Sequence, residues 1–313
     1  MRSRSFKMPP VEDSQNTRRM RRLEEQKRSR ALKVESARNV DIFAGLSLNE
    51  IEMEEEKAVP KAKRPSRWAN VAMYAEPLEM NGMGPALPDD FGTAWIAVAP
   101  VPKGKRCLVI AYKSNGQGSV VSLRSRLKGN QLMRFPSRLP TDTILDCILD
   151  EHWEHNGILH VLDVLRWRGQ DYTQCEASFR FWWRDTKIAE LEPPQPPSSS
   201  SERPPRFSYP HVLRAIPWFP NLQDPLLLLN TIIPLARTGV TVTVPLAPSP
   251  MSDEPNELVV PCASDGILLY VGESSYEKGP SLLAAWVPVE PFGDGQDSAL
   301  EVFARHVQAT TSI

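Results

Sequence analysis

The sequence lacks long apolar runs, clustered cysteines and an appreciable net charge. None of its apolar runs approaches the roughly 18 residues that a membrane-spanning helix needs, so we expect no membrane span. Its first residues lack the apolar segment of a secretory signal peptide, and residues 12–56 are too acidic for a transit peptide. Four cysteines lie far apart without a zinc-type spacing, which predicts reduced thiols of an intracellular protein, mostly in strands, with no metal and no cofactor: Cys107, Cys147, Cys175 and Cys262.

The net charge of -1 averages over segments of opposite character. Residues 1–38 hold twelve Lys or Arg and five Asp or Glu, whereas Glu50–Glu56 is an acidic run. The 30 prolines exceed the usual share for a globular protein, so several stretches cannot be regular structure. A chain of 313 residues can therefore hold one large folded domain together with disordered segments.

These changes in composition divide the chain into three parts. Residues 1–43 form a basic segment, and residues 44–66 form a linker that is first acidic and then basic. Like-charge runs resist packing and stay solvated. Residues 67–313 form the predicted domain, interrupted by a Pro- and Ser-rich insertion at 192–205 that cannot join a core. We expect an α+β domain with mostly antiparallel sheets, preceded by a basic helix.

Two short apolar runs near the middle of the chain each end on a carboxylate. They are Ile144-Leu145-Asp146 and Val161-Leu162-Asp163, and both read as buried strands because they are rich in Ile, Val and Leu. A polar, turn-prone segment separates them, and a cluster of Phe and Trp follows. Carboxylates at strand ends beside aromatic rings indicate a nucleotide site. The alternative is a β core with Asp residues at its surface.

Strand-like segments also flank this region. Trp95–Ala99 and Cys107–Ala111 predict a β meander whose hairpin mouth carries Gly104, Lys105 and Arg106. Two cations beside a glycine let both the backbone and the side chains approach a phosphate, although an ordinary charged turn has the same composition. The basic segment 122–138, which includes Lys128, could close over a triphosphate. Further on, residues 238–246 alternate like a strand, and residues 298–308 have the spacing of an amphipathic helix.

The basic segment contains a predicted helix over residues 17–40. It has no Pro or Gly, and Asp13, Ser14 and Thr17 are candidate caps at its start. Its apolar stripe is thin: Met20, Leu23, Ala31 and Val34. Such a helix buries too little to fold alone, so we expect it to order on nucleic acid, an anionic membrane or an acidic protein groove, or else to remain a solvated tail.

This N-terminal segment resembles the importin-β-binding segment of the snurportin family of nuclear import adaptors. In that family a short basic and aromatic motif precedes an Arg-rich helix. Arg4-Ser5-Phe6-Lys7 followed by RRMRRLEEQKRSR repeats that arrangement here. The resemblance implies importin-β-binding residues at Phe6, Lys7, Arg18, Arg19, Arg21, Arg22, Lys27, Arg28 and Arg30.

The resemblance extends through most of the chain and implies a cap-binding domain. TILDCI, VLDVLRWRG and FRFWW are its most specific parts, and Gly104-Lys105-Arg106 corresponds to a family segment at the RNA cap. An aromatic of the family's cap pocket falls at Pro77 here, so Trp68 or Tyr74 would take its place. Trp286 would stack on the methylated guanine, since a cationic ring is attracted to an indole face. Its composition alone also fits a core residue.

The order of motifs is similar to that of the mRNA capping guanylyltransferase and DNA ligase fold. Those enzymes attach the nucleotide to a lysine, and Val101 stands at that position here. A valine has no lone pair with which to attack a phosphate, so we expect no enzyme activity. Trp286 stands where the enzymes use another lysine, and Asp146 and Asp163 are then structural remnants rather than metal ligands.

The snurportin resemblance implies an adaptor that shuttles between nucleus and cytoplasm. It would bind the 2,2,7-trimethylguanosine cap of spliceosomal small nuclear RNAs, link the ribonucleoprotein to importin-β, and return with an exportin. Two alternatives remain open. One is an active guanylyltransferase or RNA ligase that uses Lys103 or Lys105. The other is a general RNA-binding protein that relies on basic patches alone.

Overall fold

This computed structural model describes residues 14–43, 66–80, 87–114, 118–192, 206–246, 257–291 and 297–311. The predicted sites Phe6 and Lys7, nearly all of the linker 44–66 and nearly all of the insertion 192–205 lie outside those ranges. Across the described ranges, no helix combines the length and the apolar character that a membrane crossing requires.

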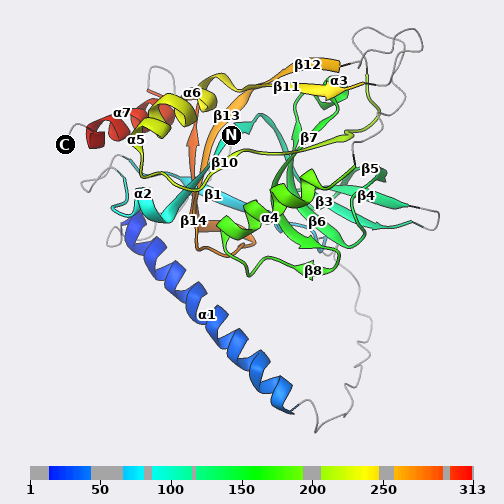
Figure 1. Cartoon of the computed structure of the whole chain (residues 1–313), viewed down its shortest axis with the longest axis horizontal. Coiled ribbons are helices and arrows are strands. Elements are labelled where there is room, and N and C mark those ends of the chain that lie inside the picture. Colours follow the sequence, from blue (N-terminus) through cyan, green and yellow to red (C-terminus); the bar gives the residue numbers. More distant parts are fainter. Residues whose placement is uncertain are drawn as a thin grey trace, which may run out of the picture.

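A five-stranded sheet, here called sheet A, forms the middle layer of the folded part (Figure 1). Its strand order is β1-β14-β13-β2-β10. β1 pairs in parallel with β14, and the other neighbours are antiparallel. The strands are β1 (Met73–Pro77), β2 (Trp95–Pro102), β10 (Trp218–Phe219), β13 (Ser264–Val271) and β14 (Gly279–Pro288).

A seven-stranded sheet, sheet B, has the order β5-β4-β3-β6-β7-β8, with β9 added in parallel beside β7. β11 (Val240–Pro245) and β12 (Glu257–Cys262) form a separate antiparallel ribbon. The strands of sheet B are β3 (Gly104–Lys113), β4 (Ser119–Ser125), β5 (Gln131–Ser137), β6 (Thr143–Asp150), β7 (Ile158–Trp167), β8 (Gln170–Asp171) and β9 (Val212–Ala215). The α+β class with mostly antiparallel sheets and an N-terminal helix is thus confirmed.

The helices cover the outer surfaces of these sheets. The long helix α1 (Gln15–Phe43) runs along the outside of the folded part, and its amino-terminal end lies near β14 and α2 (Figure 1). The helices α5, α6 and α7 pack together beside sheet A, and one π-helical turn over Leu228–Ile232 joins α5 to α6. The remaining bounds are α2 (Phe91–Ala94), α3 (Trp153–Asn156), α4 (Ala177–Ala189), α5 (Pro225–Leu227), α6 (Ile233–Thr238) and α7 (Ala299–Thr311).

Alternating residues of each strand enter different cores, because side chains on a strand point to opposite faces. On β2, Trp95 and Ala97 pack against α6 and α7, whereas Ile96 and Val98 face sheet B. On sheet B, Leu108 joins this inter-sheet core, while its neighbours Cys107 and Val109 enter a third core on the far face. Sheet A is therefore covered on both faces, and this explains its nearly continuous apolar strands.

The two strands predicted at the centre of the chain are confirmed, but Asp146 and Asp163 lie within β6 and β7 rather than at their ends. The hairpin predicted between 95 and 111 is wrong. β2 and β3 lie in different sheets and do not pair with each other. The chain passes from one sheet to the other at Lys103, whose N–H donates to Ala263 O and whose carbonyl accepts from Glu151 N. β2 instead pairs with β10 and β13, both of which come more than 100 residues later. Such distant pairing leaves no trace in the local pattern.

The predicted helix over 17–40 is present as α1, and Ser14 Oγ accepts a hydrogen bond from Thr17 N at 3.2 Å as expected for an N-cap. Its predicted apolar stripe is mostly wrong. Leu23 is buried, but Met20 and Val34 are about half exposed. The buried face of α1 is formed mainly by polar side chains that contact the folded domain. The helix was expected to order on a partner, and here its own domain provides that surface.

Two buried carboxylates in sheet B hold the two sheets together. Asp146 on β6 and Asp163 on β7 face each other in register, and neither is more than 1 % exposed. Asp146 pairs bidentately with Arg106, whose Nη2 also donates to Met73 O on β1 at 2.7 Å. Asp163 pairs with the fully buried Arg180 of α4, whose Nη2 donates to its Oδ2 at 2.9 Å.

Arg180 also reaches beyond sheet B. Its Nη1 donates to Cys175 O at 2.7 Å and to Ser274 O, just after β13, at 3.0 Å. Each of the two ion pairs thus joins a strand of sheet B to backbone that belongs to or adjoins sheet A. Asp146 and Asp163 have structural partners, as the sequence interpretation proposed.

We predict that Asp163→Ala lowers the free energy of unfolding by about 3–5 kcal/mol, because Arg180 is left buried without its counter-charge. Urea unfolding followed by circular dichroism measures this loss. The control Glu190→Gln removes the exposed ion pair with Lys187 and should cost about 0–1 kcal/mol. Equal effects of the two substitutions would contradict the role of Asp163 in holding the two sheets together.

Candidate functional site

A cavity of about 720 Å³ opens where sheet A meets sheet B. Its walls come from β1 and β14 of sheet A, from the start of β3, and from the connection between β4 and β5. The residues that line it are Tyr74, Ala75, Val101, Pro102, Gly104, Lys105, Arg106, Ser125, Arg126, Leu127, Lys128, Asn130, Leu132, Ile148, Asp265, Leu268 and Trp286.

The structure brings six of the seven predicted cap-binding residues to this cavity. They are Tyr74, Gly104, Lys105, Arg106, Lys128 and Trp286. Trp68 is not among the lining residues. It packs, partly buried, against the core between the sheets, and the guanidinium of Arg67 lies 4.7 Å from its ring centroid. Of the two candidates for the missing family aromatic, Tyr74 is the one that lines the cavity.

The aromatic walls of the cavity are Tyr74 and Trp286, which lie on the adjacent strands β1 and β14. Trp286 is partly exposed and packs on one side against the inter-sheet core. Pro77, at the position of the family aromatic, is the strand partner of Trp286. The guanidinium of Arg126 lies 5.1 Å from the ring centroid of Tyr74. A planar ligand that reaches Trp286 therefore finds an exposed indole held by a rigid strand pair.

Arg106 lines the cavity but its charge is already neutralised. Its Nε and Nη2 donate to Asp146 at 2.7 and 2.8 Å. Although burial opposes the charged form, the Asp146 carboxylate outweighs it and raises the pKa of Arg106. Tyr276 adds its hydroxyl, which donates to Asp146 Oδ2 at 2.6 Å and accepts from Met73 N at 2.8 Å. Arg106 thus fixes β1 against β3, and sequence reasoning missed the part played by Tyr276.

The remaining charges favour an anion. Lys105 and Lys128 are exposed, Arg126 is partly exposed, and Asp265 is the one carboxylate among the described residues that line the cavity. Arg126 lies in the basic segment 122–138 but was not singled out from the sequence, because nothing in that segment distinguishes it from its neighbours. Its stacking on Tyr74 depends on a fold that brings β1 beside the β4–β5 connection.

Gly104 is required by close packing rather than by backbone freedom. A Cβ at this position would lie 2.2 Å from Leu149 O on β6, closer than any real contact. The glycine lets β3 begin directly beside β6, and Lys105 follows at the cavity wall. Lys103 lies outside the lining and pairs with Glu290 at 2.5 Å, a hydrogen bond that raises its pKa.

Residues 85–209 match the family model of the m3G cap-binding domain of Snurportin1. Over this stretch the chain is similar to snurportin. The matched part includes every strand of sheet B except β9, and it supplies Gly104, Lys105, Arg106, Arg126 and Lys128 to the cavity. A domain of the cap-binding type therefore carries the basic wall of the site.

Both aromatic walls of the snurportin-like site lie outside the matched residues. Tyr74 precedes the match and Trp286 follows it, yet β1 and β14 pair side by side and close the cavity. The two halves of the site come together because β13 pairs with β2, which lies inside the match.

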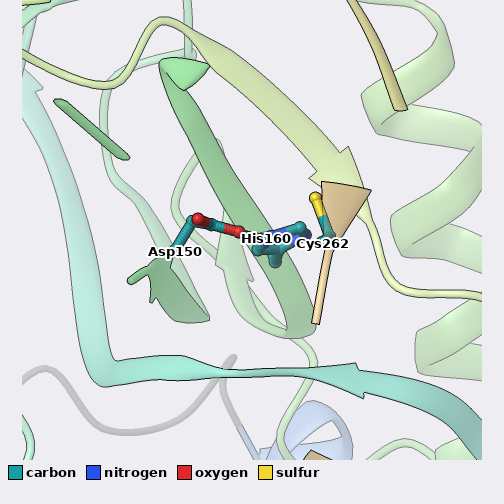
Figure 2. A group of neighbouring side chains, drawn as sticks. All are labelled: Asp150, His160 and Cys262. Atoms are coloured by element: carbon teal, nitrogen blue, oxygen red, sulfur yellow. Dashed lines mark hydrogen bonds and ion pairs between the residues drawn. The ribbon is translucent and has the colours of Figure 1, made fainter. Parts of the chain in front are cut away.

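A second polar group of this snurportin-like chain lies away from the cavity. The donor atoms of Asp150, His160 and Cys262 all lie within 4.8 Å of one another and are buried (Figure 2). His160 Nε2 and Asp150 Oδ2 are 2.8 Å apart, and Asp150 Oδ1 accepts from His152 N and Asn156 Nδ2. Burial raises the pKa of the Cys262 thiol to about 12. The contact between Asp150 and His160 joins β6 to β7, and Cys262 of β12 lies beside it.

Asp150 makes this network sensitive to acid. Burial acts to raise the pKa of Asp150, but hydrogen bonds from His160, Asn156 and the His152 backbone outweigh it, so the pKa lies below its usual value. A lowered carboxyl pKa stabilises the fold above the unfolded-state pKa of about 4, and this contribution is lost as the pH falls through the folded-state value.

The free energy of unfolding of the wild type should fall as the pH is lowered below about 4. We predict that this fall is smaller in Asp150→Asn, because the variant has no carboxyl group to protonate at that position. Urea unfolding at a series of pH values measures this dependence. The control Asp297→Asn removes an exposed carboxylate that pairs with Arg305 and should leave the wild-type dependence in place. Parallel curves for Asp150→Asn and the wild type would show that Asp150 is not responsible.

Proposed function

We propose that this protein is a nuclear import adaptor. It binds the 2,2,7-trimethylguanosine cap of spliceosomal small nuclear RNAs and links the ribonucleoprotein to importin-β. The observation that carries this proposal is the cavity, whose cationic wall lies in the matched m3G cap-binding domain and whose other wall carries the partly exposed Trp286. A cap has both properties that such a site would recognise, namely a charged aromatic ring and a chain of phosphates.

The ring would stack on Trp286. A methylated guanine carries delocalised positive charge, and stacking on an indole contributes on the order of 1–3 kcal/mol per base. Ala75, Leu268 and Ile148 give the cavity apolar walls near this ring. Dimethylation at N2 removes hydrogen-bond donors from the base, so an apolar wall favours the trimethylated cap over the monomethylated one.

The phosphates would bind to Lys105, Lys128 and Arg126. These three cations stand on the opposite wall, which comes from β3 and the β4–β5 connection. Since Arg106 is engaged with Asp146, its role in this proposal is to position β1 and β3 rather than to contact a phosphate.

We predict that Trp286→Ala weakens binding of a trimethylguanosine cap dinucleotide by about 10-fold or more, as expected from the loss of one stacked ring. Quenching of tryptophan fluorescence or calorimetry measures the dissociation constant for trimethylated and monomethylated caps. The control Trp182→Ala removes another partly exposed indole, on α4, and should leave binding unchanged. Equal, weak binding of both caps by the wild type would contradict the proposed specificity.

We further propose that the site binds a nucleotide without transferring it, on a fold related to the capping guanylyltransferases and DNA ligases. The mostly antiparallel two-sheet architecture supports this relation. Val101, at the position of the nucleophilic lysine, is buried in the cavity wall and offers no lone pair. Lys105 is a cavity lysine that could replace it, and this gives the enzyme alternative a specific test.

Incubation with radiolabelled GTP and a divalent cation should leave no covalent nucleotide on the protein. The measurement is denaturing electrophoresis followed by autoradiography, with a capping guanylyltransferase as the positive control. A labelled band that is lost in Lys105→Arg would establish the enzyme alternative instead.

The remaining assignments concern the N-terminal segment and traffic. The Arg-rich helix α1 supports importin-β as the partner, since Arg forks bind paired carboxylates. An exportin for the return step, and localisation in both nucleus and cytoplasm, belong to the same proposal. The division into a basic segment 1–43, a linker 44–66 and a cap-binding domain 67–313 also remains part of it.

A further inference from the structure

Helix α1 presents one specific face to the folded domain. Its buried residues are Gln15, Arg19, Leu23 and Gln26, which recur at intervals of three or four and so lie along one side of the helix. These residues contact β1, β14 and the connection between β13 and β14. Specific hydrogen bonds along one side of the helix therefore hold this part of α1 against the domain.

Two glutamines fix the position of α1 along the domain, because each side-chain amide both donates and accepts a hydrogen bond. Gln15 donates from Nε2 to Pro77 O and accepts at Oε1 from Glu79 N, both at 3.0 Å. Gln26 accepts at Oε1 from Ser275 N at 2.9 Å and donates from Nε2 to a Glu277 carboxylate oxygen at 2.7 Å. Each amide satisfies a backbone group of the domain, so a shift of the helix by one turn would break both sets.

Acidic side chains of the domain lie along helix α1 and form ion pairs with its basic side chains. They pair with four of the cations that the sequence assigned to importin-β. The pairs are Arg18 with Glu79 at 3.2 Å and Glu76 at 3.8 Å, Arg22 with Glu277 at 2.7 Å, Lys27 with Glu273, and Arg30 with Glu176 at 3.8 Å. We call this set of glutamates the docking acids.

Arg19 is the most deeply docked cation and is incompletely satisfied. It is 3 % exposed, its guanidinium lies 4.9 Å from the Trp95 ring centroid, and its Nε donates to Leu282 O at 3.2 Å. Burial lowers its pKa to about 10. Among the described residues no hydrogen-bond partner reaches its buried Nη2. A carboxylate partner could satisfy this group better than the docked state does.

We propose that the docking acids and importin-β compete for helix α1. In the free protein α1 is docked on the domain and is unavailable to importin-β. This inference rests on the importin-β assignment of the proposed function. Arg19 is buried and the side chains of Arg18 and Arg30 are mostly covered, so these cations cannot contact the domain and a groove on a second protein at once. Arg28, by contrast, faces solvent on the other side of the helix. Binding of the partner therefore requires the helix to leave the domain.

The test removes four of the five docking acids and leaves the helix unchanged. Glu176 is retained because it is the N-cap residue of α4. The full-length docking variant carries Glu76→Gln, Glu79→Gln, Glu273→Gln and Glu277→Gln. A matched control carries Glu154→Gln, Glu190→Gln, Glu192→Gln and Glu301→Gln, which remove the same charge from four ion pairs that do not involve α1. Retention of cap binding by both variants shows that the fold is intact.

Two measurements are made on each protein. Hydrogen exchange of the α1 amides reports docking without any partner, and titration with importin-β gives the apparent dissociation constant. If the helix is free in about a tenth of the wild-type molecules, the apparent affinity is reduced about 10-fold relative to the free helix. We expect the docking variant to lose α1 protection and to bind importin-β about 10-fold more tightly, while the control matches the wild type.

The remaining outcomes overturn the proposal in distinguishable ways. An unprotected α1 in the wild type would show that the helix does not dock. Loss of protection without a gain in affinity would show that docking and importin-β binding are independent. Protection in the wild type without importin-β binding by any of the proteins would refute the partner assignment, and with it this competition, while the docked helix would stand.

Discussion

The two sheets depend on a pair of buried carboxylates that face each other across β6 and β7. Asp146 and Asp163 would repel each other in the interior, and each is balanced by an arginine that also binds backbone of the opposite layer. Removing one partner from such a pair leaves an uncompensated charge, so the arrangement tolerates little change. Arg106 lines the cavity and holds β1 against β3, so its ion pair with Asp146 helps to shape the cavity.

The strands that shape the cavity also support helix α1. β1 carries Tyr74 toward the cavity, and Pro77, at its end, accepts a hydrogen bond from Gln15. β14 carries Trp286 toward the cavity, while the carbonyl of Leu282 receives Arg19. One pair of strands therefore serves a ligand site through some residues and a docked helix through others. The proposed cap-binding cavity and the proposed importin-β-binding helix α1 are thus both supported by the strand pair β1–β14.

The sequence predicted these features unevenly, and the reasons are physical. β6 and β7 were found because runs of Ile, Val and Leu with turn residues between them are a local signal. The β2–β3 hairpin was wrong because the partners of β2 lie far away in the chain. The buried Arg180 could not be found, since arginine is rarely buried unless a specific partner is present. Lys105 and Lys128 were named for the site from their basic segments, and Tyr74 and Trp286 through the resemblance. Only the fold brings them to one cavity.

The distribution of charge in the cavity separates the two tasks of a cap reader. Arg106 is neutralised by Asp146, so it contributes position rather than attraction to an anion. Attraction then falls to Lys105, Arg126 and Lys128, which are solvent-accessible and therefore screened by salt. In the proposed complex Trp286 acts through stacking, which salt screens far less. Under that proposal salt weakens the attraction of every capped ligand alike, whereas the proposed preference between methylation states rests on the aromatic and apolar walls.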